Sequence, residues 1–294
     1  MNDLPKLIAI VGPTSSGKSA LAVKLARCFD GEVISADSRQ IYKGLDIGTG
    51  KITESEMHGI PHYLLSFVSL PRQYSVALYK KAADGAIRKI LDKNKLPILV
   101  GGTGLYIDAV TRGIYFPDVP PDSKLRKKLE KRNAKMLLAI LEKLDSARAS
   151  KIDPQNRRRI IRAIEIAKVL PRTPKKSVQP NYDTLFLGIR RSPVELRKRI
   201  KNSVHDRIQR GLIQETKKLL KSGLSKKRLA EIGLDYRFAI EALGGRLSRQ
   251  ELIEKLETAS RQYAKRQHTW FKRYKDIHWF KNEKEAKQLV LQFL

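Results

Sequence analysis

The residues with the most recognisable chemistry lie near the N-terminus. Residues 12–19 read GPTSSGKS and match the pattern G-x-x-x-x-G-K-[ST], in which backbone N–H groups and the start of a helix hold phosphate oxygens. Lys18 supplies a point charge, and the Ser19 hydroxyl can bind Mg²⁺ directly or through water. The alternative is a tight glycine turn with a surface lysine. The predicted phosphate-binding residues are Gly12, Pro13, Thr14, Ser15, Ser16, Gly17, Lys18 and Ser19.

An acidic residue is expected beside this loop. Asp37 follows the short apolar run EVIS at 32–35, and the carboxyl ends of parallel strands meet at one edge of a sheet. Its carboxylate can coordinate Mg²⁺, cap a helix through Asp37-Ser38, or act as a general base. The position alone favours none of the three.

A nucleotide hydrolase also needs an Asp at the end of an apolar strand to hold Mg²⁺. The strand LPILV at 96–100 ends instead in Gly101-Gly102-Thr103-Gly104. This difference argues against an ordinary ATPase.

The elements around these residues predict an α/β fold. KLIAIV at 6–11 reads as a strand, and ALAVKLAR after the glycine loop has helical spacing. Strands that are apolar on both faces and alternate with helices are typical of a buried, doubly wound parallel sheet. We predict a core like that of the P-loop NTPases, with a mostly parallel sheet flanked by helices. TLFLGI at 184–189 should return to that sheet.

Residues 121–180 differ from the flanking sequence, because their pattern predicts helices but no strands. KLRKKLEKRNAKMLLAILEKL is amphipathic and basic, and Asp153-Pro154 reads as the N-cap and first residue of a second helix. The three prolines between 171 and 180 indicate a linker. We therefore expect a core of residues 1–120 and 181–294, with a helical insertion at 121–180. Capping boxes at Ser192–Glu195 and Ser248–Glu251 predict two long helices in the second half of the core.

Composition and the lack of membrane and export signals predict a soluble cytoplasmic protein. No apolar run approaches the roughly 18 residues that a membrane span needs, and the N-terminus lacks the pattern of a secretory signal. Cys28 is the only cysteine, which excludes an intramolecular disulfide and suits a reducing compartment. We interpret Cys28 as a helix-packing residue. The five histidines do not form a metal-ligand spacing, and Trp270 and Phe271 read as core packing rather than base stacking.

The formal net charge of +30 points to an anionic partner. Residues 1–120 hold 15 Lys and Arg against 11 Asp and Glu, whereas residues 121–294 hold 45 against 19. The excess thus lies C-terminal to the phosphate loop. The alternative is a generally lysine-rich surface.

Five blocks together give the sequence a family resemblance: GPTSSGKS, ISADSRQIYKGLDIGTGK at 34–51, VGGTGLY at 100–106, DPQNRRRIIRAIEI at 153–166 and RQYAKRQHTWF at 261–271. In this order, over nearly the whole chain, they resemble the bacterial tRNA dimethylallyltransferases. That family transfers a dimethylallyl group from dimethylallyl diphosphate to N6 of the adenosine 3′ to the anticodon, in tRNAs that read codons starting with U.

The resemblance implies roles for the residues above. The loop would hold the diphosphate of an isoprenoid, with Mg²⁺ and Lys18 stabilising it as it departs. Asp37 would be the base, with Thr14 in the same passage. The partners would be dimethylallyl diphosphate and a tRNA anticodon stem-loop, bound by a monomer. By analogy the tRNA-facing residues are Asp37, Ser38, Arg39, Gln40, Thr103, Arg126, Gln155, Asn156, Arg157, Arg158 and Arg159.

Two positions depart from the family pattern. The family has an arginine, thought to assist the diphosphate, eight residues before the glycine that here is Gly211; this chain has Ser203 there. Arg199 and Arg207 lie four residues either side on the same helical face, so either could take its place. The second departure is IGLDYR at 232–237, where many members have a Gly-Tyr pair followed by a basic residue.

Three other functions remain to be distinguished. A phosphate-loop kinase of a small metabolite would share the fold and Lys18, but it needs neither the basic excess nor the insertion. An isopentenyltransferase of free AMP, ADP or ATP would share Asp37 but should lack DPQNRRR. A non-catalytic RNA-binding protein would not need an intact Lys18, Ser19 and Asp37.

Overall fold

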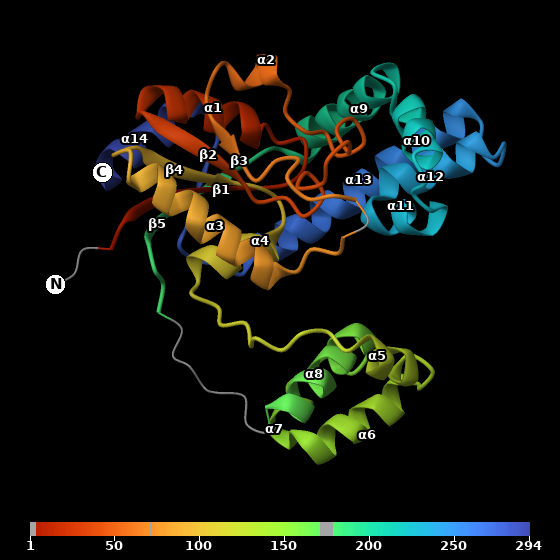
Figure 1. Ribbon diagram of the computed structural model, residues 1–294. Coiled ribbons are helices and arrows are strands. Elements are labelled where there is room, and N and C mark those ends of the chain that lie inside the picture. Colours follow the sequence, from red (N-terminus) through yellow and green to blue (C-terminus); the bar gives the residue numbers. More distant parts are fainter. Residues whose placement is uncertain (1–3, 71, 171–178) are drawn as a thin grey trace. The chain divides into compact units, whose positions relative to one another are not determined.

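The computed structural model describes residues 4–70, 72–170 and 179–294. The chain forms two compact units (Figure 1). One, which we call the core unit, joins Met1–Ile114 to Gln179–Leu294, and the other, which we call the insertion, is Tyr115–Val178. The expected proline linker falls largely on residues 171–178, which lie outside the described residues.

A six-stranded sheet of strand order β3-β2-β4-β1-β5-β6 forms the centre of the core unit, and every described strand pair is parallel. This confirms the predicted fold class. The strands are β1 (Lys6–Val11), β2 (Gly31–Ser35), β3 (His62–Tyr63), β4 (Leu96–Val100), β5 (Asp183–Ile189) and β6 (Ile277–Phe280). The short strands β3 and β6 were not predicted, since neither carries a long apolar run.

The sheet is covered on both faces, which explains its continuous apolar strands. Along β1, Leu7, Ala9 and Val11 pack into one cluster, with helices α3 (Val76–Leu91) and α4 (Gly104–Thr111). Ile8 and Ile10 alternate into the opposite cluster, with α1 (Lys18–Cys28) and α14 (Glu283–Phe293). Figure 1 shows α1 and α3 on opposite faces. Strand β1 therefore presents its carboxyl end, and the loop that follows, from the middle of a rigid sheet.

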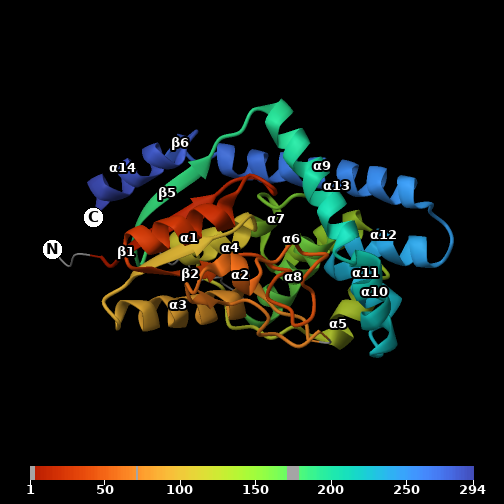
Figure 2. The same cartoon turned by 90° about the horizontal axis from the view of Figure 1, so that it is seen from above.

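A group of helices with its own hydrophobic cluster lies beyond the carboxyl ends of the strands (Figure 2). Both predicted capping residues begin helices here, because the side chain of Ser192 accepts from Glu195 N and that of Ser248 accepts from Glu251 N. The cluster packs against the segment around Ile41 and Leu45, which brings that segment to the end of the sheet. Its helices are α9 (Pro193–Gln209), α10 (Leu212–Lys221), α11 (Lys226–Ile232), α12 (Leu234–Leu243) and α13 (Arg249–Lys272). The four-residue helix α2 (Glu54–Met57) precedes β3.

The insertion has a small hydrophobic core of its own, around Leu137, Leu141, Ile160 and Ile164. The basic amphipathic run is interrupted, because Asn133 caps a new helix by accepting from Met136 N. Its helices are α5 (Ser123–Leu129), α6 (Ala134–Leu144), α7 (Ser146–Ala149) and α8 (Arg157–Val169).

Two sequence interpretations were wrong. Asp153-Pro154 does not begin a helix: Asp153 Oδ1 accepts from Gln155 N in a turn, and Asn156 is the N-cap of α8. Cys28 is exposed at the last residue of α1 and does not pack against the core. Phe271, in contrast, is buried as predicted. None of the helices in the described part of the chain combines the length and apolarity needed to cross a membrane.

Candidate active site

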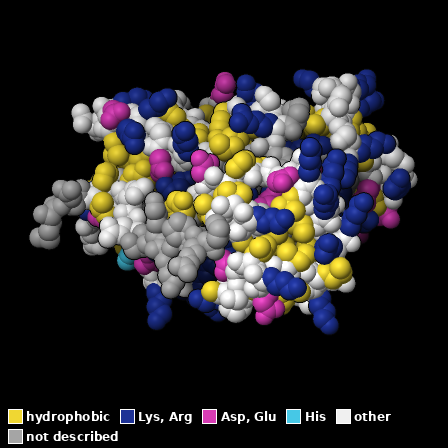
Figure 3. Space-filling view, turned by 60° about the horizontal axis from the view of Figure 1, so that its bottom comes forward, with side chains coloured by type: hydrophobic (Ala, Val, Ile, Leu, Met, Phe, Trp, Pro, Cys, Tyr) yellow, Lys and Arg dark blue, Asp and Glu magenta, His cyan; other side chains and the backbone are white. Residues whose placement is uncertain are grey.

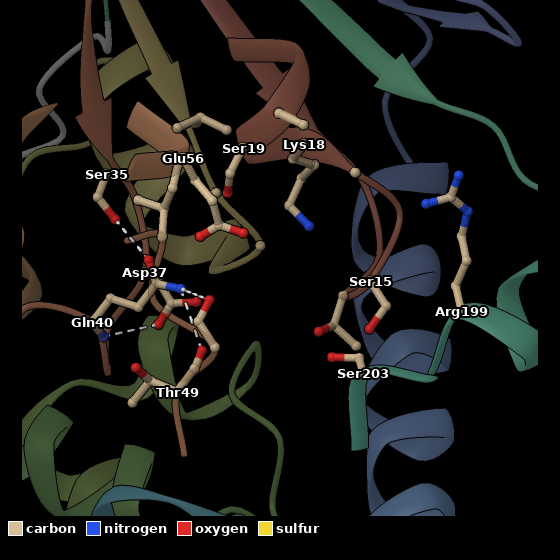
Figure 4. A pocket seen from close by; sticks show the side chains of 18 of the residues that line it. Ser15, Lys18, Ser19, Ser35, Asp37, Gln40, Thr49, Glu56, Arg199 and Ser203 are labelled. Atoms are coloured by element: carbon tan, nitrogen blue, oxygen red, sulfur yellow. Dashed lines mark hydrogen bonds between the residues drawn. The ribbon is translucent and has the colours of Figure 1, made fainter. Parts of the chain in front are cut away.

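A pocket of about 450 Å³ opens at the carboxyl ends of β1, β2 and β4. The phosphate loop forms one wall, and Asp37 and Gln40 contribute to another (Figure 4). In that view the Lys18 side chain points from the loop into the pocket. Residues that the sequence separates widely are therefore brought together here, from the N-terminal loop to α9 and α13.

The loop at 12–19 has the backbone that its glycines allow. Gly12 and Gly17 have φ angles of 144° and 98°, a region that residues with a Cβ rarely adopt. Lys18 Nζ donates to Pro13 O at 2.7 Å, and burial lowers the pKa of Lys18 to about 8, a shift that the charge of Asp37 opposes. The ammonium is therefore poorly solvated, which favours its pairing with an anion bound in the loop.

Asp37 uses its two carboxylate oxygens differently. Oδ1 accepts from Arg39 N at 2.8 Å and from Gln40 N at 3.3 Å, which fixes the turn after β2. The hydrogen bonds of this carboxylate within the described residues all go to Oδ1, which leaves Oδ2 without a partner there, and Asp37 lines the pocket. One oxygen therefore holds the loop in shape while the other remains free for a ligand, a metal ion or a proton.

The sequence Gly101-Gly102-Thr103-Gly104 allows close packing. A Cβ on Gly101 would lie 2.1 Å from Ala36 O, and one on Gly102 would lie 2.0 Å from Gln267 Nε2. Thr103 Oγ1 accepts from Ser38 N at 3.1 Å, so this loop also supports the turn of Asp37. These contacts explain why small residues follow β4, and this segment has no carboxylate that could hold a metal ion.

Gln267 of α13 joins the phosphate loop to the β4 loop, and sequence reasoning missed it. Its Oε1 accepts from Thr14 N at 2.7 Å, and its Nε2 donates to Gly102 O at 2.9 Å. The side chain is buried, on the stripe that also carries Ala264 and Phe271. A glutamine on an otherwise apolar helical stripe is the signal that could have found it.

Glu215 of α10 is a second residue that sequence reasoning missed. Its carboxylate accepts from the backbone N–H groups of Asp46, Ile47 and Gly48, at 2.8 to 3.1 Å, and from Tyr236 Oη at 2.7 Å. The chain continues from this anchored segment to Thr49 and Gly50, which line the pocket. Glu215 thereby orders one wall of the pocket without entering it.

Tyr263 of α13 lines the same pocket as Asp37. Burial, followed by the negative charge of Asp37, raises the pKa of Tyr263 to about 12, so its hydroxyl is protonated at neutral pH. The guanidinium carbon of Arg39 lies 5.2 Å from the centre of the Tyr263 ring, within the range of a cation–π contact.

The predicted site residues of the insertion differ in the hydrogen bonds and ion pairs that they form within the protein. Arg126 Nε and Nη2 donate to Glu165 at 2.7 and 2.8 Å, and Arg157 Nη2 donates to the carbonyls of Glu130 and Arg132. Arg158 and Arg159 are exposed and form no ion pair among the described residues. Of the three arginines at 157–159, these two are free to bind an anion.

Metal binding by side chains alone finds no support in the described residues, where no group of three or more His, Cys, Asp or Glu could hold an ion. Positive charge is abundant instead. On the face seen in Figure 3, Lys and Arg side chains are spread widely and outnumber Asp and Glu.

Two family models match the chain, "IPP transferase" over residues 40–274 and "Isopentenyl transferase" over residues 5–71. A tRNA dimethylallyltransferase of Pelotomaculum thermopropionicum is 42% identical, over 97% of this chain and 93% of the relative. One from Thermoanaerobacter sp. is 41% identical, over 98% of this chain and 97% of the relative.

Solved structures agree with these matches. The tRNA isopentenylpyrophosphate transferase of Bacillus halodurans is 37% identical, with a TM-score of 0.72 over 98% of this chain and 95% of that one. A eukaryotic dimethylallyltransferase acting on tRNA is 28% identical, with a TM-score of 0.81 over 98% of this chain and 77% of that one. The chain described here belongs to the IPP transferase family.

Proposed function

We propose that the protein transfers a dimethylallyl group from dimethylallyl diphosphate to N6 of the adenosine 3′ to the anticodon, in tRNAs that read codons starting with U. The observation that carries this proposal is that Asp37, whose Oδ2 has no partner among the described residues, shares a pocket with the phosphate loop while β4 ends in glycines. Such a pocket suits an anionic leaving group and a proton acceptor better than the hydrolysis of ATP.

The proposed transfer needs a leaving group and a proton acceptor, and the donor diphosphate and Asp37 supply these. The C–O bond between the dimethylallyl carbon and the diphosphate breaks, and both electrons leave with the diphosphate. The N6 lone pair forms the new C–N bond, and the proton that N6 loses passes to Asp37 Oδ2. Lys18 and the loop amides stabilise the charge that grows on the diphosphate. The target base leaves its stack to enter the pocket.

Mg²⁺ fits the donor set of the pocket. Mg²⁺ prefers oxygen ligands and is usually bound by one or two protein groups together with phosphate oxygens and water. The Ser19 hydroxyl lines the pocket, as do the carboxylates of Asp37 and Glu56. Ser19 would be the protein ligand, and phosphate oxygens of the donor would supply further oxygen ligands. When bound, the ion would neutralise charge on the diphosphate.

The tRNA-facing residues proposed from the family fall in both units. Ser38, Arg39, Gln40 and Thr103 surround the Asp37 turn, with Gln40 in the pocket wall. Gln155, Asn156 and the arginines that follow lie at the start of α8, where exposed cations and a helix N-terminus suit phosphate contacts.

Replacing Arg158 and Arg159 with Ala should weaken tRNA binding and flatten its salt dependence, because each lost phosphate contact lowers the slope of log K against log[salt] by roughly 0.7 to 0.9. tRNA titrations at several salt concentrations measure this. Adding Arg157→Ala should also destabilise the insertion, since Arg157 donates to two carbonyls. Donor binding should be unchanged in both variants. An unchanged salt slope would show that these arginines are only a solvated face.

The transfer reaction itself is the decisive test. Radiolabelled dimethylallyl diphosphate should label total tRNA, and it should label neither free AMP nor a reaction without acceptor. Labelling of AMP in preference to tRNA would favour a transferase of free nucleotides. A requirement for ATP hydrolysis would exclude an isoprenoid diphosphate as the ligand of the loop.

A further inference from the structure

Arg207 of α9 touches both positions at which the chain departs from its family pattern. Its Nη1 donates to Ser203 Oγ at 2.8 Å, and its Nε lies 2.9 Å from Asp235 Oδ2, in an ion pair whose geometry falls short of a hydrogen bond. Ser203 and Arg207 are four residues apart on one helix, so they share a face. Asp235 comes from the first turn of α12.

The environment of this arginine differs from that of an ordinary surface cation. The side chain of Arg207 is 10% exposed and that of Asp235 is 14% exposed. Removing a guanidinium from water costs several kcal/mol unless its charge is compensated. A single, imperfectly aligned carboxylate compensates only part of that cost.

One side of the Arg207 guanidinium remains available. Its Nη2 has no hydrogen-bond partner among the described residues and is still reached by solvent. Arg207 and Ser203 line the pocket that is also lined by Lys18 and Ser15 of the phosphate loop (Figure 4). Arg207 therefore contributes to the pocket of the phosphate loop and keeps one nitrogen without a protein partner there.

Arg199, another cation of this pocket, is less suited to hold an anion. Its Nε donates to Glu195 Oε1 at 3.1 Å, and its side chain is 43% exposed. Water and salt screen a charge at such a site much more than one in a mostly buried position. Arg199 lines the same pocket, on the side of Gly17 of the phosphate loop.

We infer that Arg207 is the arginine that binds the leaving diphosphate in this chain, and that Asp235 is its positioning residue. Ser203, being short, leaves room for the guanidinium that arrives from one helical turn further along and accepts one of its hydrogen bonds. The two departures from the family pattern are then parts of one rearrangement. This inference rests on the proposed function for the identity of the diphosphate donor.

Binding of inorganic diphosphate, measured by calorimetry, tests the assignment without any transfer step. Arg207→Met should weaken binding roughly 10- to 100-fold, because it removes a hydrogen bond to a charged group. Asp235→Asn keeps the cation but loosens it, so it should raise the KM for the donor several-fold and leave the KM for tRNA unchanged. Arg210→Met is the matched control, since Arg210 pairs with Asp206 on the same helix and is solvent-exposed. It should bind diphosphate normally.

Moving the charge back by one turn tests the role of Ser203. The triple variant Ser203→Arg, Arg207→Met, Asp235→Asn should recover most of the diphosphate affinity that Arg207→Met loses. Diphosphate affinity of Arg207→Met within about twofold of wild type, or a triple variant that stays as weak as Arg207→Met, overturns the inference. If Arg207→Met does not fold, the donor KM of Asp235→Asn and the triple variant decide the question. A wild-type protein that binds diphosphate through Arg207 yet transfers nothing to tRNA would refute the proposed function alone.

Discussion

Asp37→Asn should remove most of the transfer rate while leaving tRNA and donor binding near normal. The asparagine Oδ1 can still accept from Arg39 N and Gln40 N, so the turn after β2 should persist. At the free position an amide replaces the basic oxygen, and an amide cannot take the N6 proton. Loss of a general base costs on the order of 10² to 10⁴ in rate. Single-turnover transfer to a preformed complex with tRNA measures the chemical step directly.

A comparison with Asp37→Ala separates the two uses of this carboxylate. Alanine loses both oxygens, so this variant should be as slow as Asp37→Asn and should also have a lower melting temperature, because the turn loses its two hydrogen bonds. If Asp37→Asn keeps more than about half of the wild-type rate, a group other than Asp37 accepts the N6 proton. Asp37 would then be a structural residue of the turn.

Lys18→Ala should weaken the binding of dimethylallyl diphosphate and of inorganic diphosphate by similar factors, on the order of 10²-fold, because it removes a hydrogen bond between two charged groups. Both ligands place the same two phosphates in the loop. The expected loss is large because burial has already stripped this ammonium of much of its water. Calorimetric titration of each ligand gives the two factors.

Lys24→Ala is the matched control for Lys18→Ala. Lys24 lies on the same helix and pairs with Glu283 at 2.6 Å, but its side chain is 58% exposed. Surface pairs of this kind contribute about 0 to 1 kcal/mol to stability. Diphosphate affinity should therefore be unchanged. A selective loss of inorganic diphosphate, with dimethylallyl diphosphate unaffected in Lys18→Ala, would mean that the loop does not hold the donor.

The local signals in the sequence were sufficient for the sheet and the phosphate loop. KLIAIV and LPILV are continuous apolar runs, and both form strands with the predicted bounds. Asp37 could be placed beside the loop because parallel strands end at one edge. These inferences need only a strand's own residues and a general rule of topology.

The rest of the site could not be predicted, because it depends on which helix faces meet. Gln267 and Thr14 are separated by 253 positions, and Glu215 and Ile47 by 168. No local pattern states that α13 crosses the phosphate loop or that α10 approaches residues 46–48. The relation between Arg207 and Asp235 was equally hidden, since it requires the packing of α9 against α12.

The order of strands in the sheet has a consequence for how the chain folds during synthesis. Strand β1 pairs with β4 on one side and with β5 on the other, and the ribosome delivers β5 only after the whole insertion. The insertion can collapse around its own apolar residues as it emerges, because domains generally fold as units and N-terminal parts emerge first. Meanwhile one edge of β1 stays unpaired, and an unpaired apolar edge invites pairing with another chain. The phosphate loop therefore gains its final support late, when β5 closes that edge and the C-terminal helices follow.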